Sequence, residues 1–210
     1  MTGRRLLAAA YLALVLPLCA ADAPALPAPG KLLVATRKMP DADFAQAVVL
    51  LLHSDSQGVV GLIVNRPSEV PLSHLFPKLK DAPTGKAPVY LGGLVALGAR
   101  GLVRSLEHNP GKAAPEKTNP PKSSPHNRAA AWPVFGGVSV ITDPTALEKL
   151  ALTGARPEVF RVYAGYTGWS AEQLRHELKL GYWTVATPTE SIVFDPHPAT
   201  VWSRLIGPGR

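Results

Sequence analysis

The chain has 210 residues, of which 46% are hydrophobic, and this is enough for one domain with a sizeable core. Its 22 Lys and Arg residues against 15 Asp and Glu residues give a formal net charge of +7. Part of this surplus lies in the polar segment 107–131 and part in Arg4 and Arg5, ahead of an apolar run. The charge therefore does not indicate a nucleic-acid-binding face, and we expect no direct contact with nucleic acid.

Residues 1–23 have the layout of a secretory signal peptide, in which a basic start precedes an apolar run at 6–20 and then small residues. We expect export, most simply to the periplasm, with a cytoplasmic location as the alternative if the start codon has been misassigned. Cleavage after Ala21 would remove Cys19, the single cysteine, whereas lipidation of Cys19 would retain it. An uncleaved leader is the one contact with a membrane that we expect.

Residues 24–29 contain three prolines and form an extended spacer before a single folded domain at 30–207. Apolar runs bounded by turn residues predict the strands of its first half. The turn chemistry of 54–58 joins two of these strands into a hairpin, and Pro77 interrupts a short helix at 72–79. The expected strands lie at 31–36, 45–52, 59–64, 89–91 and 101–106.

The segment 107–131 has five prolines and little apolar surface, so we expect a flexible insertion, with a functional lid as the alternative. Beyond it, Asp143 followed by Pro144 predicts the start of a helix that Gly154 ends. Further strands are expected at 138–141, 159–165, 183–186 and 192–194, and a closing helix is expected at 199–206.

The stretch 162–183 is expected to organise the domain. A buried strand ends at Gly165, and a glycine turn carrying Gly168 and Trp169 leads into a helix. Ser170 followed by Gln173 is a capping box at the start of that helix, and Gly181 stands where a left-handed C-cap belongs. We interpret the tryptophan as a core anchor of this strand, turn and helix unit.

Polar residues at the two ends of the predicted hairpin are candidate binding residues. His53 ends one strand and Asn65 follows the other, so antiparallel pairing places the two at opposite ends. Arg66 could clamp a carboxylate or phosphate with both ends of its guanidinium. The alternative is structural, with Asn65 capping a turn and Arg66 paired with an acid such as Glu69.

Paired glycines at Gly92 and Gly93 could offer backbone amides to an anion, although tight-turn geometry is the simpler interpretation. No Walker or dinucleotide fingerprint is present, and no Gly-x-Ser-x-Gly frame surrounds a serine. His53 with Asp55, and Asp195 with His197, supply two possible metal ligands each, whereas zinc needs three or four. We therefore expect neither a cofactor nor a metal.

Several motifs occur together in a fixed order. They are HSDSQGVVGLIVNRP at 53–67, the pair Gly92-Gly93, and GYTGW at 165–169 followed by Gln173, Leu174 and Glu177. This pattern resembles the YqgE/AlgH family, also called UPF0301, over the range from 30 to about 207. The resemblance implies an α+β fold in which a mixed, partly barrel-like sheet is flanked by helices, and it brings a family label of transcriptional regulator.

Two departures from the family pattern limit what the resemblance implies. Leu94 stands where the family usually has proline, and Leu52 stands where many relatives carry cysteine, so no thiol function is carried over. We expect a non-enzymatic binding or regulatory protein that acts through a groove near the glycine turns, on a protein or small-molecule partner. The alternative is a small-molecule hydrolase or transferase with a site near His53 and Arg66.

Overall fold

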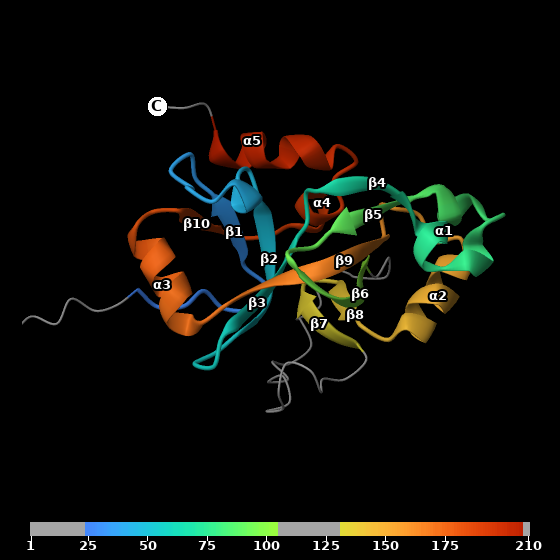
Figure 1. Ribbon diagram of the computed structural model, residues 1–210, viewed down its shortest axis with the longest axis horizontal. Helices are drawn as coiled ribbons and strands as arrows, with labels where there is room; N and C mark the ends of the chain where they lie inside the picture. Colours follow the sequence, from blue (N-terminus) through green and yellow to red (C-terminus); the bar gives the residue numbers. More distant parts are fainter. Residues whose placement is uncertain (1–23, 105–130, 208–210) are drawn as a thin grey trace, which may run out of the picture.

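The computed structural model describes residues 24–104 and 131–207 (Figure 1). The described strands form one sheet of ten, in the order β10-β1-β2-β3-β9-β6-β8-β7, with β5 beside β9 and β4 beside β5. The pair of β5 and β9 is parallel, and the neighbours along the main path are antiparallel. The strands are β1 (Leu32–Ala35), β2 (Val48–Ser54), β3 (Val59–Ile63), β4 (Pro67–Pro71), β5 (Pro88–Leu91), β6 (Val95–Arg104), β7 (Ala131–Phe135), β8 (Val138–Ile141), β9 (Phe160–Trp169) and β10 (Trp183–Ala186).

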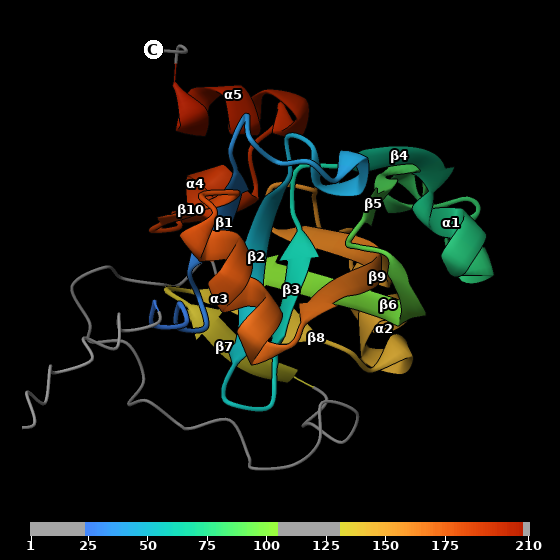
Figure 2. The same ribbon diagram turned by 60° about the vertical axis from the view of Figure 1, so that its left-hand side comes forward.

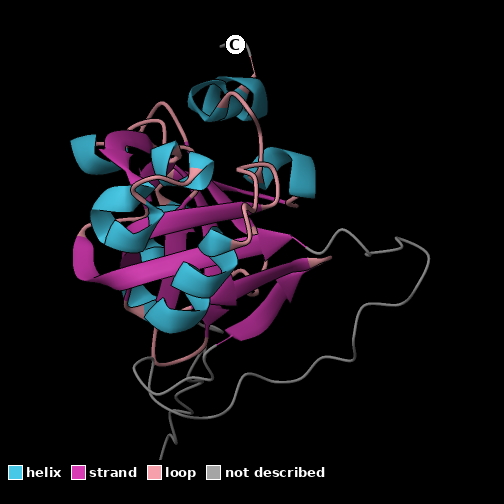
Figure 3. Cartoon of the chain, turned by 90° about the vertical axis from the view of Figure 1, so that its right-hand side faces the viewer, coloured by secondary structure: helices cyan, strands magenta, loops and turns pink. Residues whose placement is uncertain are grey.

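The helices lie around the outside of this curled sheet (Figure 3). Three of them begin at side-chain caps, in which Asp143, Ser170 and Thr189 accept hydrogen bonds from backbone amides of the first turn. The α-helices are α1 (Leu72–Leu75), α2 (Pro144–Leu152), α3 (Ala171–Lys179), α4 (Glu190–Val193) and α5 (Val201–Ile206), and short 3₁₀ turns occupy Ala42–Phe44, Pro77–Leu79, Pro83–Lys86 and Pro198–Thr200. The expected α+β fold with a partly barrel-like sheet is confirmed.

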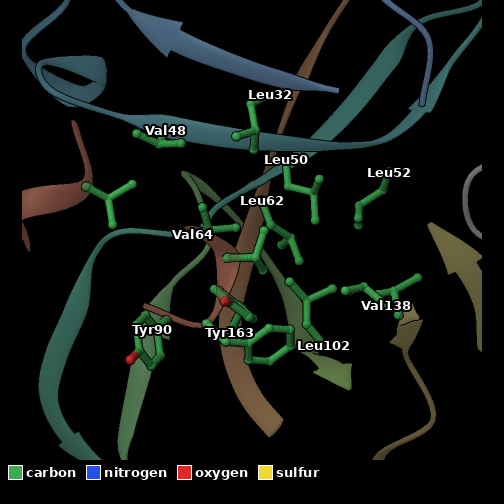
Figure 4. Close-up of a cluster of buried hydrophobic side chains, with 14 of the residues drawn as sticks. Leu32, Val48, Leu50, Leu52, Leu62, Val64, Tyr90, Leu102, Val138 and Tyr163 are labelled. Carbon is green, nitrogen blue, oxygen red and sulfur yellow. The ribbon is translucent and has the colours of Figure 1, made fainter. Parts of the chain in front are cut away.

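The core has three parts, which follow from the curl of the sheet. Side chains on its inner face, among them Leu50, Leu62 and Tyr163, converge from strands on both sides of the curve (Figure 4). On the outer face one cluster lies beneath α3, where Leu174 packs, and another beneath α1 and α2, where Leu147 packs. Because both faces of the central strands are covered, β2 is apolar along nearly its whole length.

Strand β9 is the centre of this architecture, and its length lies alongside several other strands (Figures 1 and 2). It pairs with β3, β5 and β6, and it continues to Trp169. The expectation that the strand ends at Gly165 in a glycine turn is therefore wrong. Gly165 has φ +72°, and the pairing with β6 shifts register beside it, so the glycine bends the strand without ending it. Ser170 then caps α3 directly.

Other boundaries differ from expectation for local reasons. The strand expected at 192–194 is wrong, because Thr189 accepts a hydrogen bond from the Ile192 amide and starts α4. Strand β2 begins at Val48 instead of residue 45, since Gln46 has φ +57° and bends the chain there. Strands β4 and β7 were not anticipated, because each contains proline.

Two expectations fall largely outside the described residues, namely the leader at 1–23 and the insertion at 107–131, of which only Ala131 belongs to a described strand. In the parts of the chain that are described, no helix has the length and apolar character needed to cross a membrane.

Candidate functional site

Asn65 is buried and joins the end of β3 to the loop before β2. Its Oδ1 accepts a hydrogen bond from the Val48 amide at 2.9 Å, and its Nδ2 donates to the Gln46 carbonyl at 2.9 Å. The side chain thus uses both its donor and its acceptor on the backbone around a residue with positive φ. This is a structural role, close to the turn-capping alternative.

Arg66 holds the same loop from the next position. Its Nη1 donates to the Asp43 carbonyl and its Nη2 donates to the Ala45 carbonyl at 2.9 Å, so the expected pairing with Glu69 is replaced by backbone contacts. Burial lowers the pKa of the guanidinium, and the carboxylates of Asp43 and Asp41 oppose that shift. The fork that could clamp an anion is therefore used to fix two carbonyls.

Gly92 and Gly93 lie where three strands come into close contact. The Gly92 amide donates to the Ala164 carbonyl of β9, while the Gly92 carbonyl accepts from the amide of Ile63, the last residue of β3. A Cβ on Gly92 would stand 2.5 Å from the Gly165 carbonyl oxygen, and one on Gly93 would stand 2.2 Å from the Tyr166 carbonyl carbon. Both glycines are required by backbone approach, and the closest contacts that a Cβ would make are with β9.

Gly168 and Trp169 belong to the same strand but differ in how closely they are packed. A Cβ on Gly168 would meet its nearest neighbour at 3.5 Å, which is an ordinary contact. Trp169 is buried, and its indole Nε1 donates to the Glu177 carboxylate at 3.1 Å. The indole of Trp183 donates to the same carboxylate at 2.7 Å, and the two rings meet edge to face. Glu177 thereby ties α3 to β9 and β10.

His53 is the candidate whose surroundings best suit acid–base chemistry. Its side chain is buried at the hairpin end of β2, and Nε2 lies 2.7 Å from the Asp55 carboxylate. Burial acts to raise the pKa of Asp55, but amide hydrogen bonds from Gln57 and Gly58 and the charge of His53 outweigh it and leave the pKa below its ordinary value. The pair orients the imidazole, as a histidine base requires.

The structure separates the candidates as antiparallel pairing predicted. His53 stands opposite Val60 in β3, and Arg66 follows six residues later. At about 3.3 Å per residue, this corresponds to roughly 20 Å. Asn65, Arg66 and Gly92 are close together, since the Leu91 amide donates to the Arg66 carbonyl. His53 shares no site with them, and no group of three metal-ligating side chains occurs among the described residues.

One polar cluster was missed, because it belongs to no recognisable motif. Arg161, within β9, is buried and donates to the carbonyls of Pro157, Val193 and Asp195. Complete burial raises the pKa of the neighbouring phenol of Tyr163, and the charge of Arg161 opposes the shift. An arginine in an otherwise apolar strand was the available signal, and here it joins α4 and the chain after it to the sheet.

Three exposed apolar residues flank Gly92 and Gly93 in the chain, namely Leu91, Leu94 and Val95, and we call them the apolar patch. Leu91 stands beside Ala164 on one side of β9, and Val95 stands beside Tyr166 on the other. Leu91 is 50% exposed and Leu94 is 57% exposed. Ala164 packs against the outer cluster beneath α1 and α2, whereas Tyr166 packs against the inner cluster.

A family model described as AlgH-like matches residues 32–208. The chain belongs to the AlgH-like family. A UPF0301 protein of Burkholderia multivorans is 34% identical over 167 residues, 78% of each chain, and one of Streptomyces coelicolor is 32% identical over 179 residues, 84% of each chain. The resemblance to this family that the sequence motifs indicated is confirmed.

Two solved structures share the fold of this AlgH-like chain. The solution structure of the AlgH protein from Pseudomonas aeruginosa has a TM-score of 0.62 at 27% identity, covering 87% of this chain and 89% of that one. The crystal structure of a Corynebacterium diphtheriae protein has a TM-score of 0.61 at 23% identity, covering 86% of each chain. The family is one of uncharacterised proteins, and its name assigns no reaction.

Proposed function

We propose that this protein is a non-enzymatic binding protein, exported by its leader, which presents the apolar patch to a partner protein. The observation that carries the proposal is a contrast between motif residues engaged in the fold and exposed apolar residues where β5 and β6 meet β9. The motif residues Asn65, Arg66 and Gly92 are used by the fold, while large apolar side chains beside them face solvent. Exposed apolar groups gathered within one short stretch of chain, here three within residues 91–95, support a protein interaction site.

Leu94 strengthens this proposal, because it follows the glycine pair at a place where the family usually has proline. The Gly93 backbone is held against Tyr166, so the exposed leucine stands on a fixed support. A rigid support lowers the conformational entropy lost on association. Any regulatory role would then follow from binding a protein, without contact with nucleic acid.

Site-specific photo-crosslinking tests the proposal in cells that express the full chain. A photoreactive amino acid at Leu94 should give a discrete adduct with one partner protein. Leu152 is the matched control, since it is 50% exposed but lies at the end of α2. Adducts of the same size and yield from both positions, or none from Leu94, would overturn the proposal.

The pair of His53 and Asp55 favours a second candidate, a hydrolase or transferase that uses the imidazole as a base. Arg66 cannot belong to such a site, given its distance along the strands. Purified protein and the His53→Ala variant, compared on carboxyl and phosphoryl ester substrates, discriminate the two functions. Turnover that the variant loses while it stays folded would establish the enzyme, and unchanged background hydrolysis would favour the binding protein.

A further inference from the structure

The described sheet has three outermost strands, and two of them carry proline. Strand β4 begins with Pro67 and ends with Pro71, and β7 contains Pro133. Proline cannot donate to a neighbouring strand, and natural sheets use it with charged residues to prevent pairing at edges. Strand β10 has the sequence Trp-Thr-Val-Ala, with neither proline nor charge. Among the described edges it is the one that keeps its capacity to pair.

The register of β10 shows which of its groups face outward. It pairs with β1 from Leu32 opposite Ala186 to Ala35 opposite Trp183, and the Thr36 amide donates to the Tyr182 carbonyl. Hydrogen-bonded positions alternate in an antiparallel pair, so Trp183 and Val185 direct their backbone groups away from β1. No described strand lies on that side. Val185 is 44% exposed and Thr184 is also exposed, so solvent reaches the middle of this strand.

Basic side chains stand at both ends of this edge. Lys31 Nζ donates to the Thr187 hydroxyl at one end. At the other end Lys38 follows β1 and Lys179 ends α3, while the neighbouring Arg37 donates to the Gly207 carbonyl after α5. The nearby carboxylate of Glu177 already accepts hydrogen bonds from two indoles. The charges flanking β10 therefore favour a strand with acidic ends.

A second copy of this chain is a poorer occupant. Antiparallel pairing of β10 with itself would bring the Lys31 end of one copy to the Arg37 and Lys38 end of the other. Like charges at both ends of so short a pairing oppose association. An acidic segment from another protein meets no such repulsion.

We propose that β10 is a docking edge at which an extended segment of a partner protein adds as a further strand, held by the outward backbone groups of Trp183 and Val185. The segment has an apolar centre beside Val185 and acidic residues at its ends. Main-chain pairing supplies affinity in this mode, and the flanking charges supply selectivity. The site is distinct from the apolar patch, so either proposal can fail without the other.

Two synthetic peptides test this inference on the folded protein. Both have a core of alternating valine and threonine, and one is flanked by glutamates while the other is flanked by lysines. At low ionic strength the acidic peptide should bind at least about tenfold more tightly and should shift the NMR signals of the Val185 and Trp183 amides. Equal affinity for both peptides, or shifts confined to other strands, would overturn the proposal.

Substitution of Val185 separates backbone pairing from side-chain contact. Val185→Pro removes the outward N–H without removing a bond to β1 and should abolish acidic-peptide binding, whereas Val185→Thr keeps the N–H and should retain it. Leu94→Ser should leave peptide binding unchanged. Binding that survives in folded Val185→Pro, or a wild-type dimer that this variant dissolves, would contradict the proposal. If Val185→Pro does not fold, the amide shifts of the wild type decide.

Discussion

Asn65 and Arg66 show that a polar side chain in a motif can be fully used by the backbone. Both hold the loop at 43–48, and together they satisfy carbonyls and an amide that the bend at Gln46 removes from regular pairing. The sequence left their roles open, because an amide or guanidinium that binds a ligand and one that binds a loop look the same. Only the position of the carbonyls decides between them.

The amide of Asn65 gives the first prediction. Asn65→Asp keeps the shape but replaces the donor to the Gln46 carbonyl with a buried negative charge. We expect the free energy of unfolding to fall by about 1–3 kcal/mol, the cost of leaving a buried polar group unsatisfied. Urea unfolding measures it, with Gln57→Glu in the exposed hairpin turn as the matched amide-to-acid control. Equal stability of the two variants would show that Asn65 does not hold the loop.

Asp195 gives a prediction about pH. Burial acts to raise its pKa, but hydrogen bonds from Arg204 and the His197 amide outweigh burial and lower it. A carboxyl group with a depressed folded-state pKa stabilises the fold above its unfolded pKa, and this stabilisation is lost as the pH falls through the folded value. We therefore expect Asp195→Asn to be less stable than wild type at neutral pH.

The difference between these two proteins should begin to shrink below about pH 4, where the Asp195 carboxyl group of the unfolded chain takes up its proton, and should vanish only below the lower folded-state pKa. Urea midpoints measured across that range check it, with Asp81→Asn as a control at an exposed position. Because the Arg204 side chain is 57% exposed, solvent screening keeps the effect modest. A gap between wild type and Asp195→Asn that stays constant with pH would contradict the assignment.

At the scale of elements, local signals were sufficient for most of the fold. Capping residues located the starts of α2 and α3, and turn residues located the hairpin of β2 and β3. The sequence could not show that β9 continues past Gly165, because the strand survives there through pairing with β3, which is distant in sequence. Proline concealed β4 and β7, whose edge positions tolerate it.

The close approach of Gly92 to β9 gives a prediction that compares Gly92 with Gly168, two glycines whose φ angles lie outside the left-handed region. Gly92→Ala would place its Cβ 2.5 Å from a backbone carbonyl oxygen, whereas Gly168→Ala would meet nothing closer than 3.5 Å. We expect Gly92→Ala to lose about 2 kcal/mol or more, as overpacking does, and Gly168→Ala to change stability by less than about 1 kcal/mol. Thermal and urea unfolding measure both. A larger loss of stability for Gly168→Ala than for Gly92→Ala would contradict the close approach of Gly92 to β9.

For the whole molecule, the proposed export rests on the sequence, whereas the proposed binding surface rests on the structure. The sequence predicts a leader at 1–23, and the structure describes the domain that such a leader would carry. The motifs identified the family and the fold, but the apolar patch was not predicted, because the exposure of Leu91 and Leu94 depends on how the folded chain packs around them. The motif residues therefore did not indicate which residues we now propose to bind a partner protein.

Export is tested by fractionating cells that express the native chain and determining the mature N-terminus by mass spectrometry. We expect a chain beginning near Asp22, outside the cytoplasm, which would exclude direct control of transcription. An intact chain that keeps Met1 in the cytosol would contradict export and return the regulatory label to consideration.

The central claim is that Gly92 and Gly93 support the fold through their close contacts with β9, while the adjacent apolar patch binds a partner protein. The most direct test measures unfolding free energy and crosslinking yield together for Leu94→Ser, with the photoreactive residue at Leu91. We predict stability within about 0.5 kcal/mol of wild type, as for most surface substitutions, and loss of the partner adduct. An undiminished adduct from a stable Leu94→Ser protein would contradict the claim.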